Sequence, residues 1–131
     1  MPRPPTLRIG LLLYPGCMPA GLFAFADIVH AANRRAGMRL FETTFVAVQV
    51  GVVECAHGQS LNAVGTIQNS DLGAILISGF WAESAQQVSN TLSSNADLIA
   101  VLAGLQKSVM LWSYCTGVGL LTSAGRLNGQ K

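Results

Sequence analysis

This sequence has few charged residues. Charged residues make up 11% of the 131 residues and the formal net charge is +2, whereas an average soluble domain has roughly 25% charged residues. Half of the residues are hydrophobic, which excludes a disordered chain and a solvated coiled coil. The 8 basic residues are scattered along the chain, so this segment lacks the clustered Lys and Arg that neutralise DNA phosphates.

Cysteine and histidine are also scarce. The 3 cysteines, Cys17, Cys55 and Cys115, form no Cys-x-x-Cys pair, whereas disulfide scaffolds are denser and hold an even number. His30 and His57 have no partner three or four residues away that would build a metal-binding face. We therefore expect reduced thiols, no metal and no cofactor, in a cytoplasmic protein.

Two runs of 18 residues, 9–26 and 108–125, carry no charge. Their length is near the lower limit for a membrane-spanning helix, about 17–25 residues. The first run is interrupted by Pro15, Gly16 and Pro19, and the second is rich in serine, threonine and glycine. Both patterns favour buried elements of a globular domain over a membrane span or a signal peptide, and we expect no membrane partner.

Apolar runs typical of strands buried on both faces alternate with segments of helical spacing. Residues 1–5 are expected to be a loose lead-in, residues 51–58 a short strand and turn that could form a hairpin, and residues 61–70 have only a weak pattern. The order predicts an α/β fold, a three-layer α/β/α sandwich with a mainly parallel central sheet. The predicted strands are 6–14, 41–50, 71–78 and 108–114, and the predicted helices are 19–37, 83–92, 95–105 and 118–124.

Ligands of open α/β sheets bind beyond the carboxyl ends of the strands. Three such ends are readable: Tyr14-Pro15-Gly16, Ser78-Gly79-Phe80-Trp81 and Tyr114-Cys115-Thr116-Gly117. A cysteine between a strand and the first turn of a helix lies at the positive end of the helix dipole, which favours its thiolate. Cys115 is therefore a candidate nucleophile, and the Gly79 backbone N–H could lie near its sulfur. The alternative is that Cys115 is only a small buried residue at a strand end.

These segments carry a family resemblance. Residues 6–33, Ile77-Ser78-Gly79 and the stretch from Ser113 to Gly117 resemble the PfpI/ThiJ superfamily, which has the class I glutamine amidotransferase-like, flavodoxin-like fold. Cys115-Thr116-Gly117 and the following residues 120–129 are similar to the PfpI-like sensor domains of AraC/XylS-type regulators. The resemblance spans nearly the whole chain. It implies a small-molecule effector and a homodimer, with DNA bound by a helix–turn–helix domain beyond residue 131 and a sensor domain that is incomplete at its C-terminus.

The resemblance also assigns roles to single positions. Cys115 matches the nucleophile-elbow cysteine, and Gly79 matches the glycine beside the oxyanion pocket. The acidic residue that superfamily enzymes place on the first helix falls on Gly21, and their histidine would follow only after Lys131. These departures favour a binding domain over an enzyme. The residues expected to bind the effector are Tyr14, Gly79, Phe80, Cys115 and Thr116.

Two other functions stay open. One is a cysteine enzyme of the same superfamily, a hydrolase, hydratase or deglycating enzyme that uses Cys115. The other is a dimerisation scaffold with a buried, unreactive cysteine and no pocket. Phe80 stands where the superfamily usually has a second glycine, and Trp81 follows it. This bulky pair either narrows the pocket or lines it for an apolar ligand, or it serves ordinary packing or a dimer contact.

Overall fold

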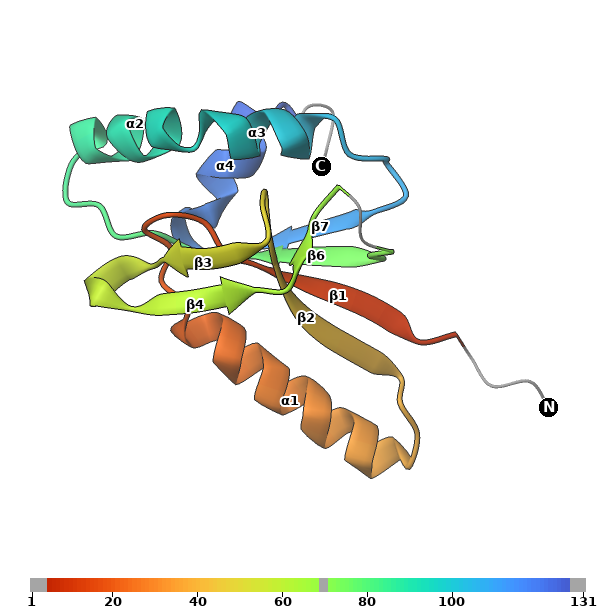
Figure 1. The fold of residues 1–131 in the computed structure, drawn as a ribbon. Helices are drawn as coiled ribbons and strands as arrows, with labels where there is room; N and C mark the ends of the chain where they lie inside the picture. The colour runs from red at the N-terminus through yellow and green to blue at the C-terminus, as the bar shows by residue number, and fades with distance from the viewer. Residues whose placement is uncertain (1–4, 69–70, 128–131) are drawn as a thin grey trace.

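The structure, a computed structural model, describes residues 5–68 and 71–127. Its centre is a five-stranded sheet in the order β5-β2-β1-β6-β7, and the strands are paired in parallel. Helices cover both faces of this sheet (Figure 1), so the predicted three-layer α/β architecture is confirmed. The strands are β1 (Leu7–Leu12), β2 (Phe41–Ala47), β5 (Gly65–Thr66), β6 (Ala74–Ile77) and β7 (Met110–Ser113).

Helix α1 (Ala20–Ala36) lies on one face of the sheet, and α2 (Ala85–Ser94), α3 (Ala96–Ala103) and α4 (Val118–Ser123) lie on the other (Figure 1). Helix α1 connects β1 to β2, whereas α2 and α3 connect β6 to β7. The two connections therefore leave the neighbouring strands β1 and β6 in opposite directions. Such a switch point is where open α/β sheets bind their ligands.

Helix α1 buries the face that its spacing predicts. Leu22 and Val29 are its buried residues, and the helix ends at Gly37, whose φ of 68° is left-handed and favours glycine. The Asn33 side chain accepts hydrogen bonds from the backbone N–H groups of Leu40 and Phe41 and donates one to the Phe41 carbonyl. These bonds fix the end of α1 to the start of β2.

The strands are shorter than predicted, and the weakly patterned segment 61–70 holds strand residues that the sequence does not predict. The second strand ends at Ala47 rather than at residue 50, because the chain turns there into an antiparallel hairpin of β3 (Gly51–Glu54) and β4 (Ser60–Ala63). A one-turn 3-10 helix, Ala56–Gly58, closes this hairpin. Strands β4 and β5 lie in or at the edge of the weakly patterned segment 61–70, where no strand was predicted. The predicted lead-in at residues 1–4, with residues 69–70 and 128–131, falls outside the described residues.

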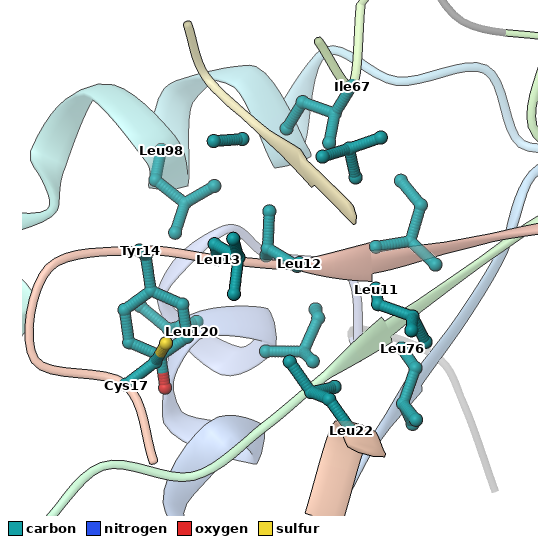
Figure 2. Packing of buried hydrophobic residues seen from close by; sticks show 14 of the residues in the cluster. Leu11, Leu12, Leu13, Tyr14, Cys17, Leu22, Ile67, Leu76, Leu98 and Leu120 are labelled. Carbon is teal, nitrogen blue, oxygen red and sulfur yellow. The ribbon is translucent and has the colours of Figure 1, made fainter. Parts of the chain in front are cut away.

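The core surrounds β1 and β6. Leu11, Leu12 and Leu13 are almost completely buried, and Figure 2 shows Leu98 of α3 and Leu22 of α1 on opposite sides of β1. The two uncharged runs form β1 with the start of α1, and β7 with α4. Within the described part of the chain, none of the helices has both the length and the apolar character needed to cross a membrane.

Candidate functional site

Cys115 occupies a sharp elbow between β7 and α4. Its φ is 55°, a left-handed conformation that costs a residue other than glycine about 1–3 kcal/mol. The side chain is exposed. Residues Cys115–Gly117 form a single 3-10 turn that leads directly into α4, so the strand, elbow and helix follow one another as the sequence predicts.

The elbow is held against the segment that follows β6. The Thr116 hydroxyl accepts a hydrogen bond from the Phe80 N–H (2.7 Å) and donates one to the Phe80 carbonyl (2.6 Å). At Gly117, a Cβ atom would lie 2.6 Å from the Ser78 carbonyl oxygen and 2.9 Å from that of Ile77. Because both contacts are to backbone, a side chain at position 117 would push the elbow away from β6.

Gly79 lies directly beside the thiol. A Cβ atom at this position would be 2.9 Å from Cys115 Cβ and 3.3 Å from Cys115 Sγ. The absence of a side chain at Gly79 therefore lets the elbow cysteine approach the β6 loop. The Gly79 carbonyl accepts a hydrogen bond from the Met18 N–H (2.9 Å), which joins the loop after β1 to the same place.

Tyr14 and Cys17 complete the contacts between the ends of β1 and β6. The Tyr14 hydroxyl donates a 2.6 Å hydrogen bond to the Ser78 carbonyl, and Cys17 pairs with Phe80 in an isolated antiparallel bridge. Burial, followed by the nearby Cys17 thiol, raises the pKa of the Tyr14 phenol. The Tyr14 hydroxyl is therefore a neutral donor that ties the two loops together.

The structure thus brings the predicted binding residues to one end of the sheet, but it exposes them unequally. Cys115 is accessible, whereas Tyr14 and Phe80 are only 1% and 2% exposed. Phe80 packs in the core and offers its backbone to Thr116. Trp81 is 62% exposed, and its indole N–H donates to the Glu83 carboxylate. The aromatic pair therefore divides between the core and the surface.

Tyr114 is a site residue that the sequence reasoning missed. A Cβ atom at Gly21 would lie 2.6 Å from Tyr114 Cζ and closer still to the phenol oxygen. The Tyr114 ring therefore fills the space beside position 21, where the resemblance places an acid. Burial raises the pKa of the Tyr114 phenol, so the group is neutral there. No pattern in the sequence indicates this contact, because Gly21 and Tyr114 lie far apart along the chain.

Among the described residues, no hydrogen bond or ion pair joins the Cys115 thiol to a carboxylate or an imidazole. His30 is exposed on α1, and His57 lies in the turn of the β3–β4 hairpin. The described ranges also contain no cluster of three His, Cys, Asp or Glu side chains that could hold a metal ion. The site presents a strained, exposed thiol without a visible base.

A cleft of about 540 Å³ lies at the carboxyl ends of β1 and β2, a size typical of small-molecule pockets. Tyr14 lines this cleft, whereas Gly79, Phe80, Cys115 and Thr116 do not. A larger hollow of about 1130 Å³ lies near the amino ends of the strands, beside Arg8. The cleft lining comes from the β1 loop, the β2–β3 segment and the start of α3: Leu13, Tyr14, Pro15, Ala47, Val48, Gln49, Val50, Val52, Val53, Glu54, Ser94, Asn95, Asp97 and Leu98.

Several solved structures match the chain over nearly its whole length. A candidate transcriptional regulator protein from Vibrio parahaemolyticus is 20% identical, with a TM-score of 0.71 over 94% of this chain and 63% of that one. A ThiJ/PfpI family protein from Pseudomonas syringae is 21% identical, with a TM-score of 0.62 over 95% and 48%. The chain has the ThiJ/PfpI fold. An AraC family transcriptional regulator from Pseudomonas putida, 17% identical, shares this fold with a TM-score of 0.64 over 93% and 63%.

The ThiJ/PfpI fold confirms the architecture that the resemblance implies. At 17–21% identity, the likeness establishes the fold and not the activity. The chain spans 63% or less of the length of these three proteins. No protein-family model matches the sequence, and no curated protein matches it.

Proposed function

We propose that residues 1–131 are the small-molecule-sensing and dimerising domain of an AraC-type transcriptional regulator. The observation that carries the proposal is the elbow itself: an exposed Cys115 at the ligand-binding edge of the sheet, with Tyr114 filling the place of the acid beside Gly21. DNA binding belongs, in this proposal, to a separate helix–turn–helix domain outside residues 1–131, and the protein acts in the cytoplasm.

The missing acid supports binding rather than catalysis. Nucleophilic catalysis by cysteine requires a base or a charge that holds the thiolate, together with an oriented partner. Gly21 offers no carboxylate, and the neutral Tyr114 phenol leaves no space for one without a shift of its ring. Gly21 and Tyr114 therefore leave the Cys115 thiol without the charged partner that catalysis requires.

Two buried hydroxyls supply polar contacts for an effector. Ser78 Oγ and Tyr114 Oη have no hydrogen-bond partner among the described residues, and a buried polar group without a partner costs about 1–3 kcal/mol. A polar group of a small metabolite that reached either hydroxyl would recover part of that cost. A nitrogen compound fits this need because an amide or amine can donate to the oxygens. The cleft beside Tyr14, which neither hydroxyl lines, is a second candidate place for the effector.

The similar structures support a regulator. One of the matched proteins is an AraC family transcriptional regulator and another is a candidate transcriptional regulator. The second function, a ThiJ/PfpI-type cysteine enzyme, is favoured by one observation, the positive φ that holds Cys115 in an exposed elbow. Turnover of a ThiJ/PfpI-type substrate that Cys115→Ser abolishes would support the enzyme.

A thermal-shift screen tests the proposed function. The chain is heated with individual small metabolites, and at a ligand concentration about 100 times Kd the stabilisation is about 2.7 kcal/mol, a shift of several degrees. We expect Cys115→Ala to lose the shift and Val118→Ala, an exposed substitution on α4, to keep it. Light scattering of the protein as it elutes from a size-exclusion column measures whether it is a dimer. A screen without any stabilising compound would contradict the proposal.

A further inference from the structure

Two of the three cysteines, far apart in the sequence, contact each other where the loop after β1 meets the end of β3. Cys17 and Cys55 are separated by 38 positions, and their Sγ atoms lie 3.5 Å apart in a thiol–thiol hydrogen bond. The Cys55 thiol in turn lies 3.7 Å from the Val53 carbonyl oxygen. Both cysteines are buried and free. The odd count and the spacing in the sequence gave no sign of this pair.

Backbone hydrogen bonds hold the two segments side by side. The Ala56 N–H donates to the Cys17 carbonyl (2.8 Å), and the Gly16 N–H donates to the Glu54 carbonyl (3.0 Å). The loop after β1 is therefore fastened to the end of β3 on both sides of the sulfur pair. A disulfide has an S–S distance of about 2.05 Å, so the two sulfurs, now 3.5 Å apart, need to approach by about 1.5 Å.

We propose that Cys17 and Cys55 are a redox-active pair that a peroxide converts reversibly into an intramolecular disulfide. In the first step, one cysteine sulfur attacks the O–O bond of hydrogen peroxide and becomes a sulfenic acid, and one water leaves. In the second step, the other sulfur displaces the sulfenic oxygen as a second water, and the S–S bond forms. The two thiols lose two electrons and two protons in total, and the peroxide is reduced to two waters.

The Cys55 thiol is a poor nucleophile at neutral pH. Burial, followed by the neighbouring Cys17 thiol, raises the pKa of Cys55 to about 12, so its reactive thiolate is scarce. The third cysteine, Cys115, is exposed and is open to direct oxidation. Attack by Cys55 therefore requires excess peroxide, and the exposed Cys115 provides an internal comparison.

The disulfide is connected to the elbow through the backbone. Cys17 forms a β-bridge with Phe80, and Phe80 is bonded through both its N–H and its carbonyl to the Thr116 hydroxyl. A covalent link from Cys17 to the β3–β4 hairpin therefore stiffens the support of Cys115. The inference stands without the proposed function, since disulfide formation requires no effector.

Peptide mapping tests the inference directly. Trypsin sites at the arginines and at Lys107 divide the chain into peptides 9–34, 40–107 and 108–126, each with one cysteine. The reduced chain is treated with excess hydrogen peroxide, then unfolded in urea so that buried thiols can be alkylated, alkylated, and digested without reductant. We expect peptide 9–34 linked to peptide 40–107, a mass loss of two hydrogens, and reversal by dithiothreitol. Peroxide treatment of a chain that is already unfolded in urea is expected to lose this preference for the 9–34 to 40–107 link.

Three variants test which cysteines form the disulfide. Cys115→Ser, at the exposed position, is expected to keep the full yield of the linked peptides, whereas Cys55→Ala and Cys17→Ala each abolish it. Wild-type protein whose Cys17 and Cys55 both remain alkylatable after peroxide treatment, or whose linked peptides include 108–126, would overturn the proposal. Both of these results are obtained with wild-type protein, so the test does not depend on whether the alanine variants fold.

Discussion

Substitution of Gly21 by alanine tests whether the Tyr114 ring fills the space beside the elbow. In the wild-type chain, the new Cβ would lie 2.6 Å from Tyr114 Cζ, and such overpacking costs about 1–3 kcal/mol. Alanine in place of glycine within a helix gains up to about 1 kcal/mol. Gly21→Ala is therefore expected to destabilise the wild-type chain by about 0–3 kcal/mol. In a Tyr114→Ala chain, where the ring is absent, the same change stabilises by up to about 1 kcal/mol.

The coupling between the two positions is then about 1–3 kcal/mol, which a double-mutant cycle resolves. Urea unfolding followed by far-UV circular dichroism measures the four free energies of unfolding. Gly119→Ala is the matched control, because its Cβ would meet only Leu92 Cδ2 at 3.8 Å, and it is expected to show no coupling to Tyr114. Equal effects of Gly21→Ala in both backgrounds would refute the placement of the ring.

Three further predictions concern the same end of the sheet. Tyr14→Phe removes a 2.6 Å hydrogen bond and is expected to lower the free energy of unfolding by about 1 kcal/mol. Tyr114→Phe removes a buried hydroxyl that has no partner among the described residues and is expected to leave the free energy of unfolding unchanged or to raise it. Urea unfolding that ranks the two variants in the reverse order would contradict these hydrogen-bond roles. Burial raises the pKa of both phenols, so the unfolded chain ionises at lower pH than the folded chain. The folded state therefore keeps its full stability below about pH 10 and loses it as the pH rises further. We expect Tm to fall between pH 8 and 11, and to fall less steeply for Tyr114→Phe. Gly117→Ala meets two backbone oxygens and destabilises by about 1–3 kcal/mol, a loss that urea unfolding detects and Gly119→Ala does not show.

The layered fold was predictable because its signals are local. Apolar runs predicted β1, β6 and β7, and alternating side chains predicted β2. The spacing of Leu22, Phe25 and Val29 predicted α1. Strands β4 and β5 were not predictable in this way. They are defined by backbone pairing with β3 and with the end of β2, and such pairing leaves little pattern in side-chain hydrophobicity.

The site was predictable in part, for a related reason. The elbow at Cys115 has a sequence signal, a small-residue turn between a strand and a helix. The pairs Gly21–Tyr114 and Cys17–Cys55 join elements that are distant along the chain, and single-sequence spacing says nothing about such contacts. Phe80 is buried and Trp81 is exposed. Which of the two side chains points inward depends on how the loop after β6 turns, and the sequence alone does not indicate this.

Protection of Cys115 from alkylation tests the central claim, that the elbow is a small-molecule binding site. A compound that raises Tm is added, and the rate of iodoacetamide labelling of peptide 108–126 is measured by mass spectrometry. The account predicts that a saturating compound slows the labelling of Cys115 at least about tenfold, since the free side chain is exposed and the thiolate is the reacting form. An unchanged labelling rate with the compound bound would contradict it.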